Sequence, residues 1–139
     1  MTTTTTPSPV TELIAFTIDT PDAGRLARFY ADLTGGEVTF EDTTYGYAQA
    51  ALLGATFNFQ TVADYSRPEW PGQEHPQQFH LDFRVGDLAT ARAHAEGLGA
   101  HLAPGQADGD GGAGWLVMVD PDGHPFCLCP PPAAESQDG

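Results

Sequence analysis

Three side chains capable of chemistry alternate along one short segment. His80, Asp82 and Arg84 occupy every second position of HLDFR, with apolar residues between them. In an extended strand this spacing places all three side chains on one face. Imidazole titrates near neutral pH and can act as a general acid or base. Guanidinium binds carboxylate or enolate oxygens through two parallel hydrogen bonds. The segment therefore indicates acid–base or anion-binding chemistry on one strand face.

The same residues also have structural interpretations. A lone histidine such as His80 is more often hydrogen-bonded and inert than catalytic, although it can also serve as a single metal ligand. Asp82 and Arg84 are close enough on one strand face to form a structural ion pair. The residue types alone allow both interpretations for each of the three positions.

Two thiols lie near the C-terminus. Cys127 and Cys129 are separated by one residue, so on a strand they share a face but are too far apart to bond easily to each other. A cysteine beside a histidine can form a nucleophilic thiolate, whereas small buried cysteines usually only pack. Because the chain has no other cysteine, we expect no disulfide framework and a reducing, cytoplasmic compartment.

A strand followed by a capped helix occurs twice in the sequence. Residues 12–19 alternate as a strand, Thr20 is the expected N-cap of the next helix, and Gly35 is its expected end. In the second half, residues 79–85 alternate as a strand, Asp87 is the expected N-cap and Gly99 the stop. Corresponding positions in the two halves keep a constant offset, which favours two similar modules.

Three short strands are expected after each helix. Each half then reads as strand, helix and three strands, with residues 10–62 forming the first module and 79–129 the second. The segment 63–78 holds three prolines and is predicted to link the modules. Residues 120–123, Asp-Pro-Asp-Gly, predict a tight turn. The tails, residues 1–9 and 130–139, are expected to be disordered because they cannot bury enough apolar surface.

The strands carry apolar residues on one face and an unusual mixture on the other. The second face holds Asn58 and Gln60 from the first half, and the histidine, the Asp–Arg pair and the two thiols from the second. Amides, an imidazole and thiols suit a partly enclosed cavity, the alternative being a solvated or dimer-covered face. Trp70 in the linker and Trp115 beside a glycine-rich stretch are candidate aromatic walls of that cavity, or core residues.

Composition excludes several classes of partner. The chain has 139 residues and a formal net charge of -14, from 19 acidic residues against 5 lysines and arginines. Such a surface repels phosphate, so neither nucleic acid nor an anionic membrane is an expected partner. No apolar run approaches the roughly 20 residues of a membrane helix, and the Thr-rich start does not read as a signal peptide.

The paired modules resemble the vicinal oxygen chelate superfamily, which includes glyoxalase-like and bleomycin-resistance proteins. HLDFRVGDL (80–88) and VDPDGHPFCL (119–128) are similar to its second module, and FNFQTV, RPEWP and PQQFHLD resemble its glyoxalase-like branch. The resemblance covers about residues 12–129. It implies an α+β fold of two βαβββ modules, with curved mixed sheets and helices on their convex side, and a homodimer as in many relatives.

The resemblance also bears on metal binding. Metal-using members hold an ion with four ligands, often His and Glu, and by motif these positions fall at Ala15, Asn58, His80 and Cys127. One expected ligand, His80, is therefore retained. We accordingly expect no metal site of the usual type and no cofactor. The alternative is a softer divalent ion, such as zinc or copper, held by His80 and Cys127.

Two functions follow as hypotheses. The first is non-catalytic binding of a small organic ligand in the concave cavity, by Asn58, Gln60, Trp70, His80, Asp82, Arg84, Trp115 and Cys127. The second is a metal-independent isomerase, cyclase or lyase in which His80 moves a proton and Arg84, Asn58 or Gln60 stabilises developing negative charge. A metal-dependent lyase or dioxygenase with substituted ligands is the third.

Overall fold

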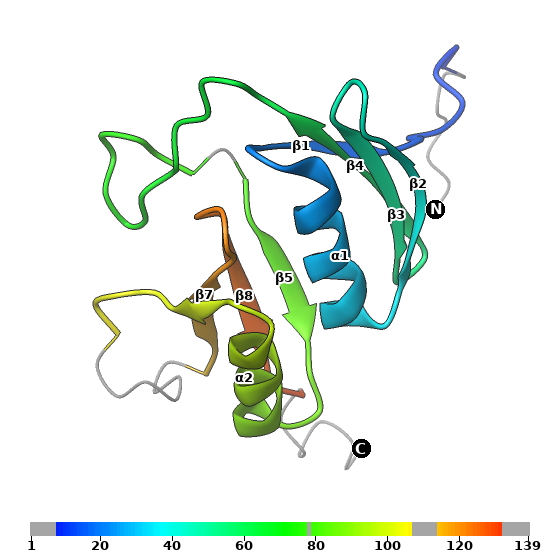
Figure 1. Ribbon diagram of the computed structural model, residues 1–139. Helices are drawn as coiled ribbons and strands as arrows, with labels where there is room; N and C mark the ends of the chain where they lie inside the picture. The colour runs from blue at the N-terminus through cyan, green and yellow to red at the C-terminus, as the bar shows by residue number, and fades with distance from the viewer. Residues whose placement is uncertain (1–7, 78, 107–113, 132–139) are drawn as a thin grey trace, which may run out of the picture.

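The structure, a computed structural model, describes residues 8–77, 79–106 and 114–131 (Figure 1). In these ranges the chain forms two four-stranded sheets and two helices. The elements are β1 (Phe16–Thr20), α1 (Ala23–Thr34), β2 (Glu37–Asp42), β3 (Tyr47–Leu52), β4 (Ala55–Thr61), β5 (Leu81–Arg84), α2 (Leu88–Gly97), β6 (His101–Leu102), β7 (Leu116–Val119) and β8 (Pro125–Cys129). The predicted α+β fold of two βαβββ modules is confirmed. The outer parts of the predicted disordered tails, 1–7 and 132–139, lie outside the described residues.

The two sheets have the same topology. The first has the strand order β1-β4-β3-β2 and the second β5-β8-β7-β6, so in each module the first strand lies beside the last. These neighbours are parallel, with Phe16 opposite Phe57 and Leu81 opposite Phe126. The remaining pairs are antiparallel, and short turns connect β2 with β3, β3 with β4, and β7 with β8. The repeat expected from the sequence is therefore a repeat of topology.

Helix α1 begins two residues later than the sequence suggests. Asp22 is the N-cap, and its carboxylate accepts from the Arg25 backbone N–H at 3.1 Å. The prediction of Thr20 as the cap was wrong because its hydroxyl is buried and donates to Asp122 at 2.6 Å. The other predicted signals hold: Gly35 ends α1 with φ of 77°, and Asp87 caps α2 through the Thr90 N–H.

One apolar core joins the modules. Helix α1 lies between the two sheets in Figure 1, and Tyr30 is fully buried there. Its ring centroid is 6.2 Å from that of Phe59 in the first sheet and 6.2 Å from that of Phe126 in the second. Because aromatic side chains bury large apolar areas, these contacts hold the modules together as one folding unit. No helix in the described part of the chain is long and apolar enough to cross a bilayer.

The second sheet is covered on both faces. Met118, Phe126 and Leu128 face the main core, whereas Val117, Val119 and Cys127 pack against Trp70 of the linker (residues 63–78). The sequence predicted a partly enclosed cavity of mixed polar residues on this face, with a solvated or dimer-covered face as the alternative. The linker folds back over the strands and converts that face into a partly apolar wall, which bounds the cavity described next.

Candidate functional site

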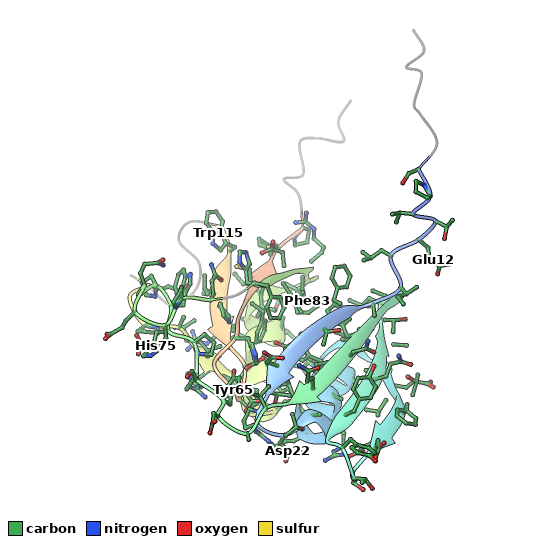
Figure 2. All side chains as sticks on the ribbon, turned by 90° about the horizontal axis from the view of Figure 1, so that it is seen from above. Glu12, Asp22, Tyr65, His75, Phe83 and Trp115 are labelled. Carbon is green, nitrogen blue, oxygen red and sulfur yellow. The ribbon has the colours of Figure 1, made fainter. Side chains whose placement is uncertain are left out.

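A cavity of about 190 Å³ lies on the linker side of the second sheet. The linker supplies Trp70 and Gln77, and His80 lies just before β5. The second sheet supplies Val117, Pro125 and Cys127. Trp115, just before β7, completes the wall, and Figure 2 shows it on the side of the second sheet away from the first module. Four residues predicted from the sequence to bind ligand, Trp70, His80, Trp115 and Cys127, thus line one cavity.

Two residues of the cavity wall, His80 and Cys127, lie beside Asp82. Asp82 on β5 is in register with Cys127 on the parallel strand β8, and His80 precedes Asp82 on the same face. The nearest ligand atoms of His80, Asp82 and Cys127 all lie within 4.8 Å of one another. The His80 Nε2 is 3.5 Å from the Asp82 Oδ1, and the His80 Nδ1 is 3.2 Å from the Gln77 Oε1.

The thiol of Cys127 is held in its protonated form. Burial and a hydrogen bond to the Asp82 carboxylate raise the pKa of Cys127 to about 12. The free thiol therefore carries no appreciable thiolate at neutral pH and is a weak nucleophile without a cation nearby. This argues against the Cys–His nucleophile that the residue types alone allowed.

The remaining predicted residues lie elsewhere. Asn58 and Gln60 belong to the first sheet, where Asn58 Oδ1 accepts from Gln49 at 2.9 Å and the Gln60 amide donates to Asp19 at 3.1 Å. Arg84 does not pair with Asp82. Its guanidinium donates to the Pro130 carbonyl. The predicted set is thus divided between two sheets, and its members that line the cavity are Trp70, His80, Trp115 and Cys127.

The donor set can be tested against the metal that the fold suggests. Ala15 offers no ligand atom, and Asn58 Oδ1 is engaged by an amide of its own sheet. The four-position set expected from the resemblance therefore does not form within one chain. Imidazole, carboxylate and thiol at His80, Asp82 and Cys127 instead match the ligand types of zinc. Sequence reasoning named His80 and Cys127 for this alternative and missed Asp82 as a ligand.

A second cluster of ionisable groups, missed from the sequence, is buried between the modules. Asp120 is fully buried and accepts from the Tyr30 hydroxyl at 2.6 Å and from the His124 Nδ1 at 2.8 Å. The His124 Nε2 donates to the Asp19 carbonyl at 2.9 Å and also lies 3.2 Å from the Tyr65 hydroxyl. The predicted turn at 120–123 is present, with the Gly123 N–H donating to the Asp120 carbonyl. The carboxylates of Asp120 and Asp122 in this turn also bond to Tyr30 and Thr20 of the first module. The turn residues alone do not predict these contacts between the modules.

The groups in this buried cluster shift one another's pKa values. Burial alone would lower the pKa of His124, but the hydrogen bond and negative charge of Asp120 outweigh burial and raise it. Burial, together with the charge of Asp120, raises the pKa of Tyr30 well above its usual value. The cluster therefore favours the protonated form of His124 beside the Asp120 carboxylate and the neutral form of the Tyr30 phenol. Its burial between helix, turn and strand end indicates a structural role.

The two βαβββ modules agree with the resemblance to the vicinal oxygen chelate superfamily. Residues 15–129 match the family described as the glyoxalase-like domain, and the chain belongs to that family. A comparison with curated proteins gives no match.

Solved structures agree with this assignment at the level of the fold. The fosfomycin resistance protein FosX from Mesorhizobium loti superimposes with a TM-score of 0.62 at 14% identity, over 94% of this chain and 99% of the other. A glyoxalase/bleomycin resistance protein/dioxygenase family enzyme from Burkholderia phytofirmans PsJN gives 0.59 at 18% identity, over 85% and 97%. A glyoxalase family protein from Enterococcus faecalis gives 0.57 at 21% identity, over 84% and 95%. A FosX variant from Listeria monocytogenes was solved with Mn(II) and a dihydroxypropylphosphonic acid.

Proposed function

We propose that this protein binds a small organic ligand in the cavity between Trp70 and Trp115. The observation that carries the proposal is the convergence of two indole rings, an imidazole and a buried thiol on one cavity of about 190 Å³. Ligand sites are concave and mostly apolar, with a few polar groups that fix orientation, and this composition has that character.

The charge of the site restricts the ligand. No lysine or arginine is among the residues that line the cavity, and Asp82 adds a carboxylate beside His80. The whole chain carries a net charge of -14, which raises the local concentration of cations and repels anions. The ligand is therefore neutral or cationic, with an aromatic or aliphatic body. A phosphonate, like the one in the FosX complex, finds no basic side chain on this wall.

A homodimer is part of the proposal. Val10, Leu13, Ile14 and Phe16 are exposed along and before β1, which is an edge strand of the first sheet. Such an unpaired edge with apolar side chains is a ready interface. We expect Ile14→Glu to convert a dimer into a monomer, measured by light scattering after size exclusion. A monomeric wild type at micromolar concentration would contradict this part of the proposal.

Intrinsic fluorescence tests ligand binding directly. The chain has two tryptophans, and both line the cavity. A panel of neutral and cationic metabolites and antibiotics, with fosfomycin as the anionic comparison, should yield at least one saturable change in emission. At a ligand concentration about 100 times Kd, binding stabilises the fold by about 2.7 kcal/mol, which a thermal melt detects.

Matched variants locate the binding site. Trp70→Phe and Trp115→Phe should each remove part of the emission change and weaken binding. Gln60→Ala should leave binding unchanged, because Gln60 lies on the first sheet and does not line the cavity. The proposal fails if no compound in a broad panel changes either fluorescence or melting temperature, or if the tryptophan variants bind as well as the wild type.

A metal-independent enzyme is the second candidate, and the environment of His80 favours it. Asp82 and Gln77 contact the two imidazole nitrogens, an arrangement that orients a proton-transferring histidine. If a bound compound is converted, His80→Gln should reduce its turnover by about 10²-fold or more, the effect of losing an acid–base catalyst. Turnover followed by NMR and unchanged in this variant would exclude His80 as the proton shuttle.

A further inference from the structure

We propose that His80, Asp82 and Cys127 together bind one Zn²⁺ ion through an imidazole nitrogen, a carboxylate oxygen and the thiolate sulfur. This site lies on the second sheet alone. It differs from the four-position set suggested by the resemblance, because Asp82 is a ligand and neither Ala15 nor Asn58 contributes. The inference goes beyond the proposed ligand binding and does not depend on it, since the metal itself is the ligand.

The backbone holds the three side chains on adjacent strands. Asp82 and Cys127 are register partners on the parallel strands β5 and β8, and His80 shares their face one step earlier. Zinc lies about 2.0–2.3 Å from each ligand atom in tetrahedral sites, which places ligand atoms roughly 3.3–3.8 Å apart. The His80 Nε2 and Asp82 Oδ1 are already 3.5 Å apart, and the whole set falls within 4.8 Å. Closing the set requires movements of about 1 Å, which side chains that are 40% and 62% exposed accommodate easily.

Gln77 fixes the imidazole in the form that a metal needs. The Gln77 Oε1, an acceptor, lies 3.2 Å from the His80 Nδ1, so this nitrogen donates its proton to the amide oxygen. The lone pair is then on Nε2, which points at the Asp82 carboxylate. Two acceptors facing each other at this distance repel, and either a proton on Nε2 or a metal ion between them relieves the repulsion. Metal-bound histidines commonly donate their second ring nitrogen to such a partner, and Gln77 has that role here.

The donor types select the ion. A thiolate together with imidazole and carboxylate suits zinc, whereas manganese favours oxygen ligands and octahedral geometry. The Mn(II) of the FosX complex therefore does not carry over to this chain. The two anionic ligands, Asp82 and the thiolate, balance the charge of Zn²⁺. Three protein ligands leave a fourth position open, and the cavity walled by Trp70 and Trp115 adjoins it.

Metal titration of the full chain tests the proposal. Chelator-treated, reduced protein is titrated with Zn²⁺ in competition with a chromophoric chelator, and separately with Co²⁺, whose spectrum reports the ligand set. We expect one zinc per chain and, with cobalt, a thiolate-to-metal charge-transfer band in the near ultraviolet. His80→Ala, Asp82→Asn and Cys127→Ser should each weaken zinc binding at least tenfold, and Gln77→Ala about tenfold as an outer partner.

The matched control is Cys129→Ser, which removes the neighbouring thiol on the same strand and should leave both zinc affinity and the cobalt band unchanged. Circular dichroism confirms that each variant is folded before titration. The proposal is overturned if the wild type binds no zinc, if Cys127→Ser keeps the charge-transfer band, or if Asp82→Asn binds zinc like the wild type. A wild type that binds no added zinc but still shows ligand-dependent fluorescence would refute this site while leaving the proposed function intact.

Discussion

Replacing Asp120 by asparagine should destabilise the protein more than changing any exposed carboxylate. The Asp120 side chain is fully buried between the modules. Its Oδ2 accepts from Tyr30 and His124, and its Oδ1 accepts from the backbone N–H groups of Asp122 and His124. Whichever way an asparagine amide is turned, its NH₂ replaces an oxygen that accepts two donors.

The magnitude follows from these contacts. Removing one partner of a buried ion pair costs about 3–5 kcal/mol, because the other charge is left uncompensated. Here the partner is the His124 imidazole, which carries the opposite charge when it is protonated. Because domains of this kind are stabilised by only about 5–15 kcal/mol, the loss is a large share of the total. For a chain of this length it corresponds to a decrease of roughly 10–20 °C in Tm.

Urea unfolding at neutral pH, followed by circular dichroism, measures the change. Asp64→Asn is the matched control, since Asp64 lies on the linker and is exposed, and surface changes stay within about 0.5 kcal/mol. A loss below about 1 kcal/mol in Asp120→Asn would mean that the buried pair contributes little beyond desolvation. The interpretation of this cluster as the connection between the modules would then be wrong.

Three further predictions concern the same junction. The pKa of His124 is raised in the folded state. The stability that His124 contributes is therefore complete below its unfolded pKa of about 6.5 and is lost as the pH rises through its folded pKa. The midpoint of urea unfolding should accordingly be lower at about pH 8 than at about pH 6. An equal midpoint at both values would contradict this. Tyr30→Phe removes one donor to Asp120 and should cost about 1–2 kcal/mol, measured by the same unfolding curves. Gly123→Ala should cost about 1–3 kcal/mol in a thermal melt, since Gly123 has φ of 99° and an added Cβ would lie 2.5 Å from the Arg67 side chain; an unchanged Tm would refute the strain.

Local signals in the sequence determined the secondary structure well. Alternating residues predicted the strands, and the Gly35 stop and the Asp87 cap were correct because each depends on a hydrogen bond or dihedral within one turn. Thr20 was assigned wrongly for the opposite reason: its hydroxyl bonds to Asp122, 102 residues away. A rule based on neighbours in the chain cannot see such a partner.

The candidate site was only partly predictable. Alternation on one strand placed His80 and Asp82 on a common face, and the family resemblance directed attention to Cys127. The parallel register of β5 with β8, which sets Asp82 opposite Cys127, depends on how the module closes. The separation of Asn58 and Gln60 from the cavity likewise depends on which sheets face each other, because strand periodicity fixes the face of a side chain but not its neighbour across space.

The amino-acid sequence by itself determined the two-module α+β fold, the acidic character and the types of reactive group, since these follow from periodicity, turn chemistry and composition. Tertiary structure alone decided that the linker covers the second sheet with Trp70, that Asp82 joins His80 and Cys127, and that Asp120 pairs with His124 beneath Tyr30. The physical reason is that burial and long-range pairing fix both the partners and the charge of a side chain, and neither is encoded in its near neighbours.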